Sequence, residues 1–257
     1  MGIFRFDAAG QIVGFEEKPT PDRLAEIGSS APSLASPGLL TPDRPFVASM
    51  GIYVFSRDVL HDVLASDRAV DFGREVLPHA LNTHRVHAYL YRGFWADVGT
   101  VSSFYNVNLM LTHRGAPFNF YHPTRPIYTR QRFLPAARLH ACRVDESLIA
   151  EGAYLDTCDV QQSVVGVRAS IHRGARVTRS ILRGADAYEE QLGDLPRGVG
   201  RDAVLDRVIV DKNARIGEGA RLGNEREIQD ADGDGYYVRG GIIIVPKGGV
   251  VKPGTVV

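Results

Sequence analysis

Two short strings in the first hundred residues contain side chains suited to binding sugars, phosphates or a metal ion. The first string, EEKP (16–19), contains Glu17 and Lys18. A carboxylate accepts hydrogen bonds from sugar hydroxyls, and a lysine ammonium donates to phosphate. In the second string Trp95, the only tryptophan, precedes Asp97 by two residues. The Asp97 carboxylate is a hard oxygen ligand suited to Mg²⁺, and the indole can wall a sugar pocket. Taken singly, the two strings are better explained by a solvated charge cluster and by a core tryptophan beside a turn aspartate.

Two lysines farther along the chain are candidates for an anion site. Lys212 lies in the string 211–217, and Lys247 lies in the string 245–248. A single lysine is normally a solvated surface residue. An anion site therefore requires these cations to converge in space, with Arg132 as a third candidate.

Other patterns that suggest metal chemistry are weaker. The aspartates between residues 230 and 234 imitate the start of a calcium-binding loop, but its twelfth position is Gly241 rather than Glu. We interpret this stretch as an exposed acidic loop. The two cysteines, Cys142 and Cys158, form no CxxC pair and no disulfide framework, which fits a reducing, cytoplasmic setting.

The charge balance argues against nucleic acid as the main partner. Thirty Lys and Arg residues oppose thirty Asp and Glu residues, whereas binding to a phosphate backbone needs a basic excess. No apolar run reaches the length of a transmembrane helix, and the first residues lack the apolar region typical of a signal peptide. We therefore expect neither nucleic acid nor a membrane as a partner.

The elements that must position the first candidates alternate between strands and helices. This alternation predicts an α/β layer architecture for residues 1–113. The expected strands are 2–17 (as a hairpin), 46–55 and 86–91; the expected helices follow Ser56, Asp71 and Thr100; and 19–45 is expected to be rich in loops.

Beyond a proline-rich linker at 114–135 the pattern changes to a six-residue period. Aligning 165–177 with 210–222 gives six identities in 13 positions, and Ala and Gly recur in phase. A six-residue period is neither helical nor a simple strand alternation. It predicts a β-helix over 136–257, with triangular coils and one inward aliphatic residue on each side. An ordinary antiparallel β domain is the alternative.

Taken together, these segments resemble the ADP-glucose pyrophosphorylases, or glucose-1-phosphate adenylyltransferases, over nearly the whole chain. The likeness is closer to the plant and cyanobacterial type than to the enteric type. In chain order, the matching strings are FEEKP (15–19), ASMGIYVF (48–55), DFG (71–73), WADVGT (95–100), SVVG (163–166) and DKNARIG (211–217).

The resemblance implies a fold and a reaction. Residues 1–113 would be the C-terminal, sugar-phosphate side of a Rossmann-like nucleotidyltransferase domain, and 136–257 a left-handed parallel β-helix for regulation and oligomerisation. The reaction would join ATP and glucose 1-phosphate into ADP-glucose and pyrophosphate, with Mg²⁺ as the cofactor, in glycogen and starch biosynthesis. The expected assembly is a cytoplasmic homo- or heterotetramer.

The resemblance also assigns roles to individual residues. Lys18 matches the lysine that holds the sugar phosphate, Glu17 contacts the glucose, and Asp97 matches one of two aspartates that hold the catalytic Mg²⁺. Lys212 and Lys247 match lysines that bind a phosphorylated effector, and Arg132 lies in a segment resembling a contributor to that site. The remaining residues of the glucose 1-phosphate pocket would be Ser49, Tyr53, Asp71, Phe72 and Trp95. We expect Lys18, Asp71, Trp95 and Asp97 to converge on one cavity.

Two departures from the family pattern bear on activity. The family's glycine-rich triphosphate loop and its other magnesium aspartate match no string here, so we expect the isolated chain to keep sugar contacts but to lack adenylyl transfer. One alternative is a non-catalytic regulatory subunit that binds a phosphorylated effector. Another is an acyltransferase with His172, the only histidine inside the regular coils, as its catalytic histidine; the upstream strings do not fit that class.

Overall fold

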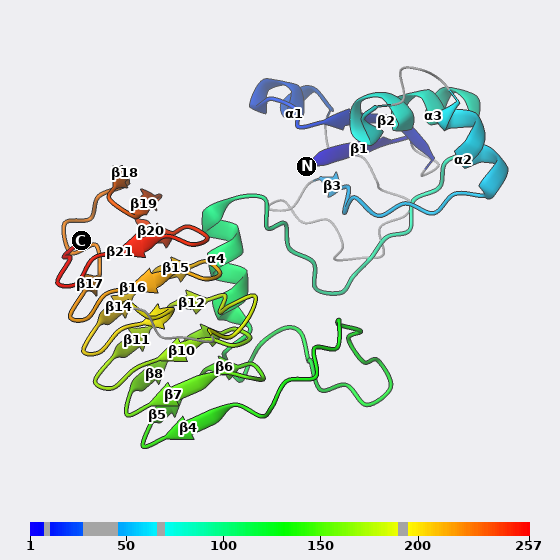
Figure 1. Cartoon of the computed structure of the whole chain (residues 1–257). Coiled ribbons are helices and arrows are strands. Elements are labelled where there is room, and N and C mark those ends of the chain that lie inside the picture. Colours follow the sequence, from blue (N-terminus) through cyan, green and yellow to red (C-terminus); the bar gives the residue numbers. More distant parts are fainter. Residues whose placement is uncertain (8–10, 28–45, 66–69, 190–194) are drawn as a thin grey trace. The chain divides into compact units, whose positions relative to one another are not determined.

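The computed structural model describes residues 1–257 except 8–10, 28–45, 66–69 and 190–194. The chain divides into two compact units, Met1–Trp95 and Ala96–Val257. Figure 1 shows helices and short strands in the first unit and a stack of strands in the second. None of the described helices is both long and apolar enough to cross a membrane.

A small sheet organises the first unit. Strand β1 (Gly2–Phe6) lies between β2 (Ile12–Glu17) and β3 (Val47–Ala48), and it is antiparallel to both. Strands β2 and β3 therefore run in the same direction and end at the same edge of the sheet. The residues that follow these two strands are brought together beside the start of β1.

Helices complete the first unit. A core of Val63, Val76 and Ala80 joins three of them, with Phe55 and Val86 packed against it. The helices are α1 (Pro21–Ile27), α2 (Arg57–Leu64), the π-helical turn η1 (Phe72–Val76) and α3 (Leu77–Thr83).

Three expectations for this unit need correction. The strand expected at 46–55 is limited to Val47–Ala48, and the strand expected at 86–91 is not formed, because the other residues have no ladder partner among the described residues. The segment 19–45, expected to be rich in loops, contains α1, in which Pro21 occupies the first turn and the Thr20 hydroxyl accepts from the Arg23 amide at 3.4 Å; its residues 28–45 lie outside the described residues. Proline is tolerated at a first helical turn, so proline density alone misled the prediction.

The second unit begins with a well-capped helix. In α4 (Val101–Met110), the Thr100 hydroxyl accepts from the Ser103 amide and the Ser103 hydroxyl accepts from the Thr100 amide, both at 3.1 Å. Tyr105 packs on Ile181 and Ile209, and its hydroxyl donates to the Arg179 carbonyl at 2.6 Å. This helix, which the sequence analysis grouped with residues 1–113, therefore packs on the coils that follow it.

The coils form a parallel β-helix with three faces. The first face contains β4 (Arg138–His140), β7 (Tyr154–Asp156), β10 (Ser170–Ile171), β13 (Gly198–Val199), β16 (Arg215–Ile216) and β21 (Val250–Val251). The second contains β5 (Arg143–Asp145), β8 (Asp159–Gln161), β11 (Arg176–Thr178), β14 (Val204–Asp206) and β17 (Arg221–Leu222). The third contains β6 (Leu148–Ile149), β9 (Val164–Val165), β12 (Ile181–Leu182), β15 (Val208–Val210) and β20 (Ile242–Val245).

The six-residue period corresponds to these three faces. Val165, Ile171 and Val177 lie on the third, first and second faces in turn, and each is at most 1% exposed. Gly174 has φ +78° at a corner, a conformation that glycine adopts without a steric penalty. The inward residues stack directly on their counterparts one coil away, as Ile171 does on Val199.

An antiparallel hairpin extends the third face. Strands β18 (Asp230–Gly233) and β19 (Tyr236–Arg239) are antiparallel, and β19 pairs with β20. The acidic stretch that imitates a calcium loop thus forms one strand and the turn of this hairpin. Among the described residues, no group of three or more His, Cys, Asp or Glu side chains could hold a metal ion.

Candidate functional site

The common edge of β2 and β3 brings together the first candidate residues. Lys18 follows β2, and its amide donates to the Met1 carbonyl at 3.2 Å. Ser49 follows β3, and its amide donates to the Gly2 carbonyl at 2.8 Å. Both residues therefore flank the start of β1, with the Lys18 side chain exposed and Ser49 buried.

An aromatic stack connects this edge to η1. The hydroxyls of Ser49 and Tyr53 share a hydrogen bond of 2.9 Å. The Tyr53 ring stacks on Phe72 with centroids 6.1 Å apart and an interplanar angle of 7°. Phe55 meets the same Phe72 ring edge-on. The stack fixes the start of η1 against the segment that follows β3.

Asp71 caps η1 and lies within electrostatic range of Lys18. Its Oδ1 accepts from the amides of Gly73 at 2.8 Å and Arg74 at 2.9 Å. The hydrogen bond from the Arg74 amide is the main cause that lowers the pKa of Asp71, and Lys18 lowers it further through its charge. The carboxylate therefore stays ionised and oriented.

Glu17 completes the group from the other side. A Cβ atom added to Gly73 would lie 2.8 Å from Glu17 Oε2, so the carboxylate lies directly against the first turn of η1. The structure thus gathers six of the predicted residues, which we call the sugar-side cluster. They are Glu17, Lys18, Ser49, Tyr53, Asp71 and Phe72; their binding roles stay predictions.

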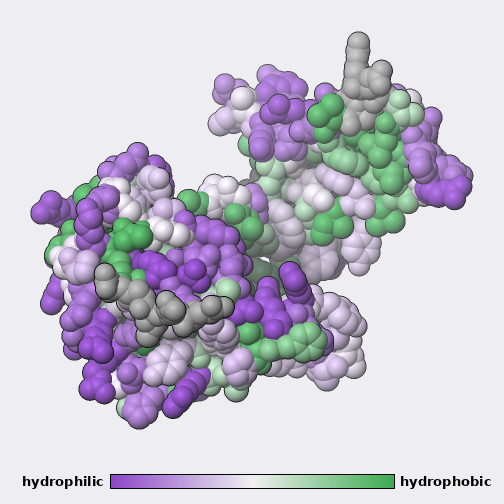
Figure 2. All heavy atoms as spheres, in the orientation of Figure 1, coloured by the Kyte–Doolittle hydropathy of each residue, from purple (hydrophilic) through white to green (hydrophobic). Residues whose placement is uncertain are grey.

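An apolar groove of about 900 Å³ adjoins the cluster within the first unit. Ser49 and Tyr53 line it, and its walls come from residues 46–56 and 84–91. Figure 2 shows hydrophobic side chains gathered in patches on this unit, whereas the coils present mostly hydrophilic ones.

Trp95 and Asp97 lie on either side of the division between the units. Trp95 is 36% exposed, and no ring contact joins it to the cluster among the described residues. Asp97 is the second residue of the second unit, and its Oδ1 accepts from the Gly99 amide at 3.0 Å. The expected convergence of these two residues with Lys18 and Asp71 therefore stays a prediction.

The exposed Asp97 carboxylate fits Mg²⁺ as a single ligand. Its Oδ1 accepts from one backbone amide, which orients the group ahead of the α4 cap. Mg²⁺ commonly takes one or two carboxylates and completes its shell with water and substrate phosphate oxygens. Asp97 alone would supply one such oxygen.

The two lysines predicted to bind an anion converge on one carboxylate. Lys212 Nζ lies 2.8 Å from Asp186 Oδ1, and Lys247 Nζ lies 2.7 Å from Asp186 Oδ2. The hydrogen bond from Lys212, followed by that from Lys247, holds the pKa of Asp186 well below its usual range. The convergence that the anion-site hypothesis requires is thus present.

A ladder of backbone hydrogen bonds places this pair at one corner of the β-helix, which we call the lysine corner. The corner runs through 151–152, 167–168, 184–185, 212–213 and 247–248, one pair of residues for each coil. The Gly152 amide donates to the Pro135 carbonyl, so the segment that carries Arg132 joins the same corner at its far end. From Gly152 to Asn213 is three coil spacings, roughly 14 Å.

Arg132 itself makes only a local contact among the described residues. Its guanidinium donates to the Arg130 carbonyl at 3.2 Å, and its side chain is exposed. Two arginines closer to the lysines escaped the sequence analysis. Arg183 pairs with Asp211 at 2.9 Å, and Arg168 donates to the Asp186 carbonyl at 3.1 Å.

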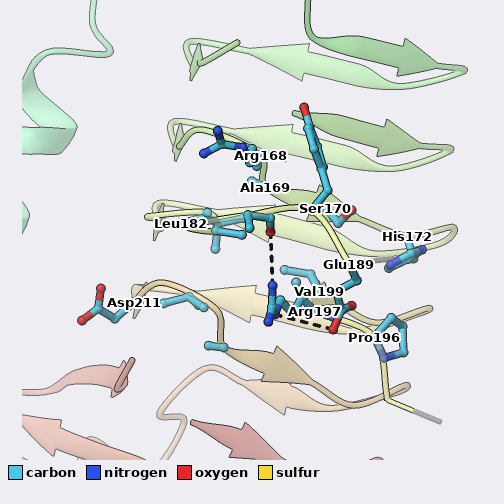
Figure 3. A pocket seen from close by; sticks show the side chains of 17 residues that line it. Arg168, Ala169, Ser170, His172, Leu182, Glu189, Pro196, Arg197, Val199 and Asp211 are labelled. Atoms are coloured by element: carbon cyan, nitrogen blue, oxygen red, sulfur yellow. Dashed lines mark hydrogen bonds and ion pairs between the residues drawn. The ribbon is translucent and has the colours of Figure 1, made fainter. Parts of the chain in front are cut away.

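A pocket of about 180 Å³ lies beside the lysine corner (Figure 3). Arg168 stands over the Tyr188 ring at 5.6 Å, and Arg197 pairs with Glu189 at 3.5 Å. His172 also lines the pocket; its Nε2 is buried without a partner among the described residues, and burial lowers the pKa of the ring. The ion pair between Arg197 and Glu189 offsets part of the positive charge of the arginines in this pocket.

Comparison with known families identifies both units. Residues 1–114 match the nucleotidyl transferase model, and residues 132–256 match the model described as the GLGC left-handed parallel beta-helix domain. The fold and the two matches thus define a nucleotidyltransferase α/β part followed by a left-handed β-helix, as the resemblance implied. In this order the two matches place the chain in the ADP-glucose pyrophosphorylase family.

Proposed function

We propose that this chain supplies the sugar-phosphate side of an adenylyl transfer from ATP to glucose 1-phosphate, which yields ADP-glucose and pyrophosphate. The observation that carries the proposal is the sugar-side cluster, in which a lysine, two carboxylates and a hydroxyl surround an aromatic stack. Such a set matches a phosphorylated hexose, because the lysine binds phosphate and the other groups bind hydroxyls.

Three side chains of the cluster would have distinct tasks. The Lys18 ammonium would hold the sugar phosphate, and the Glu17 carboxylate would accept from glucose hydroxyls. Asp71 keeps the turn of η1 in place and stays charged beside Lys18. These contacts would hold the sugar phosphate in position for attack, which lowers the entropic part of the barrier.

The bond changes of the proposed transfer are simple. A sugar-phosphate oxygen forms a bond to the α-phosphorus of ATP. The bond from that phosphorus to the oxygen it shares with the β-phosphorus breaks, and pyrophosphate leaves with that oxygen. Bound Mg²⁺ would neutralise charge on the phosphates, and Asp97 would be one of its ligands. Positioning and charge neutralisation account for most of the catalysis in such reactions.

Calorimetric titration with glucose 1-phosphate tests the sugar-side assignment. Because Lys18 would donate a charged hydrogen bond to phosphate, Lys18→Ala should weaken binding about 10- to 100-fold. Lys252→Ala is the matched control, since Lys252 pairs with Asp234 on the hairpin of the other unit. Equal affinities for the Lys18→Ala variant and the unaltered chain would remove the assignment.

A turnover assay tests the expectation about catalysis. No string of these 257 residues matches the family's glycine-rich triphosphate loop, so transition-state charge would lack its usual donors. We expect the chain assayed alone to form no ADP-glucose while still binding the sugar phosphate. Robust product formation would show that the triphosphate is held by groups not recognised here.

The lysine corner favours a second function for the β-helix: binding a phosphorylated effector within a regulatory, oligomeric subunit. The supporting observation is that Lys212 and Lys247 meet at one point. Capture of a full-length paralogue, together with effector binding abolished by Lys212→Ala, would support this role. A chain that stays monomeric and binds no phosphorylated effector would contradict it.

A further inference from the structure

The point where an anion would sit between the two lysines is occupied by a side chain of the protein. Each oxygen of the Asp186 carboxylate receives one ammonium, Lys212 at 2.8 Å and Lys247 at 2.7 Å. A phosphate would present the same kind of acceptor oxygens to the same donors. The carboxylate and an incoming phosphate therefore need the same two cations.

Asp186 is held at this point by its backbone as well as by the lysines. Its amide donates to Asn213 Oδ1 at 2.9 Å, and the Asn213 amide group returns a bond to Asp186 Oδ2 at 3.0 Å. Its carbonyl accepts from Arg168 at 3.1 Å. Asn213 is fixed in turn because its backbone amide donates a hydrogen bond to the Gly184 carbonyl at 3.0 Å. The Asp186 carboxylate is thus held in place by hydrogen bonds at the lysine corner and is not a freely moving side-chain end.

The neighbouring carboxylate does not fill the same place. Asp211 pairs with Arg183 at 2.9 Å, and its Oδ1 also accepts from the Lys212 amide at 2.7 Å. Asp186 is therefore the carboxylate that engages both ammonium groups among the described residues.

These ion pairs contribute little to the stability of the fold. The side chains of Lys212, Lys247 and Asp186 are 35%, 60% and 42% exposed. Exposed ion pairs stabilise a protein weakly, because water and salt screen them. The lysines can therefore exchange one anionic partner for another without loosening the coils.

We propose that Asp186 is a built-in competitor of the effector: its carboxylate occupies the anion position in the empty state, and a bound phosphate must displace it. The proposal rests on the effector site proposed above. It makes Asp186 the residue that sets the effector concentration at which the site fills.

Titration of the full chain with inorganic phosphate, at constant ionic strength in chloride buffer, tests the proposal. Asp186→Asn keeps the shape and the Asn213 contact but removes the charge, so phosphate should bind about three- to tenfold more tightly. Asp186→Glu restores the charge and should return the affinity toward that of the unaltered chain. Asp206→Asn is the control, because Asp206 pairs with Arg179 on the second face, away from this corner.

The outcomes separate this proposal from the effector site itself. If phosphate binds and Lys212→Ala abolishes binding, but Asp186→Asn leaves the affinity unchanged or weakens it, the competitor role is overturned while the site stands. If no variant binds phosphate, both proposals fall. An equal gain in Asp206→Asn would assign the effect to net charge and overturn the proposal as well. A melting curve for Asp186→Asn that matches the unaltered chain shows that the fold is retained.

Discussion

In the coils of the second unit, inward side chains such as Ile171 and Ile216 are fully buried, each stacked on its counterpart one coil away. In the first unit, Val54 and Tyr89 are 97% and 87% exposed. The difference follows from how each fold finds partners. A coil obtains its hydrogen bonds and its packing from the neighbouring coil, whereas most residues of the runs 50–56 and 84–91 have no ladder partner among the described residues.

The largest expected contrast is between two isoleucines. Ile216 is fully buried on the first face, so Ile216→Ala should destabilise the second unit by about 2–5 kcal/mol. Ile52 is 70% exposed in the first unit, so Ile52→Ala should change stability by less than about 0.5 kcal/mol. Urea unfolding followed by circular dichroism measures both. Equal effects would show that the two units do not differ in the way described.

Two glycines in left-handed conformations, one in each unit, should also differ in how well they tolerate a side chain. Gly51 has φ +70° with nothing within 4 Å of an added Cβ, so Gly51→Ala should cost only the backbone strain, about 1 kcal/mol. Gly174 has φ +78°, and its added Cβ would overlap Asp202 Oδ1, so Gly174→Ala should cost about 2–3 kcal/mol. Thermal melts of both variants test this. A milder effect at Gly174 would mean that Asp202 turns aside freely.

The contact of α4 with the coils gives a pH-dependent test. Burial raises the pKa of Tyr105 to about 12. This folded-state pKa lies above the ordinary value of 10.0. The contribution of the neutral Tyr105 hydroxyl to the free energy of unfolding is therefore fully present below pH 10 and is lost as pH rises through 12. Tyr105→Phe removes the bond to the Arg179 carbonyl and should cost about 1 kcal/mol at neutral pH.

Ultraviolet titration of tyrosinate checks this assignment. The unaltered chain should show one more late-titrating phenol than the Tyr105→Phe variant does. Identical titration curves near pH 12 would contradict the buried position of this hydroxyl.

The smallest contrast lies in the helix caps. Thr100 forms a reciprocal cap with Ser103 in the second unit, so Thr100→Ala should cost about 1 kcal/mol. Ser56 precedes α2 in the first unit without a side-chain cap bond, so Ser56→Ala should have almost no effect. Urea midpoints measure both. A loss at Ser56 as large as that at Thr100 would show that the serine hydroxyl caps α2 after all.

How much could be predicted from the sequence depended on whether a feature is local or repeated. The six-residue period predicted the coils because each inward residue marks one face of the β-helix. The Thr100 cap was predictable because the bonds span three residues. The strands at 46–55 and 86–91 were predicted from apolar content, which does not indicate whether a hydrogen-bonding partner exists.

For the candidate sites, too, the sequence indicated what lies in a recognisable motif and missed what only the fold brings together. The sugar-side cluster was proposed by resemblance, and the structure explains it through the shared edge of β2 and β3. Asp186 escaped notice because it belongs to no motif, and its partners are 26 and 61 positions away along the chain. Only the stacking of coils brings these three side chains to one corner.

The hairpin of β18 and β19 has a consequence for how copies of this chain can meet. It covers the last coil strand of the third face and leaves β18 as the outermost strand, with Asp230 and Asp232 exposed on it. Carboxylates along an outer strand repel a second strand that approaches edge-on. The β18 edge is therefore a poor template for a strand from a second copy of the chain.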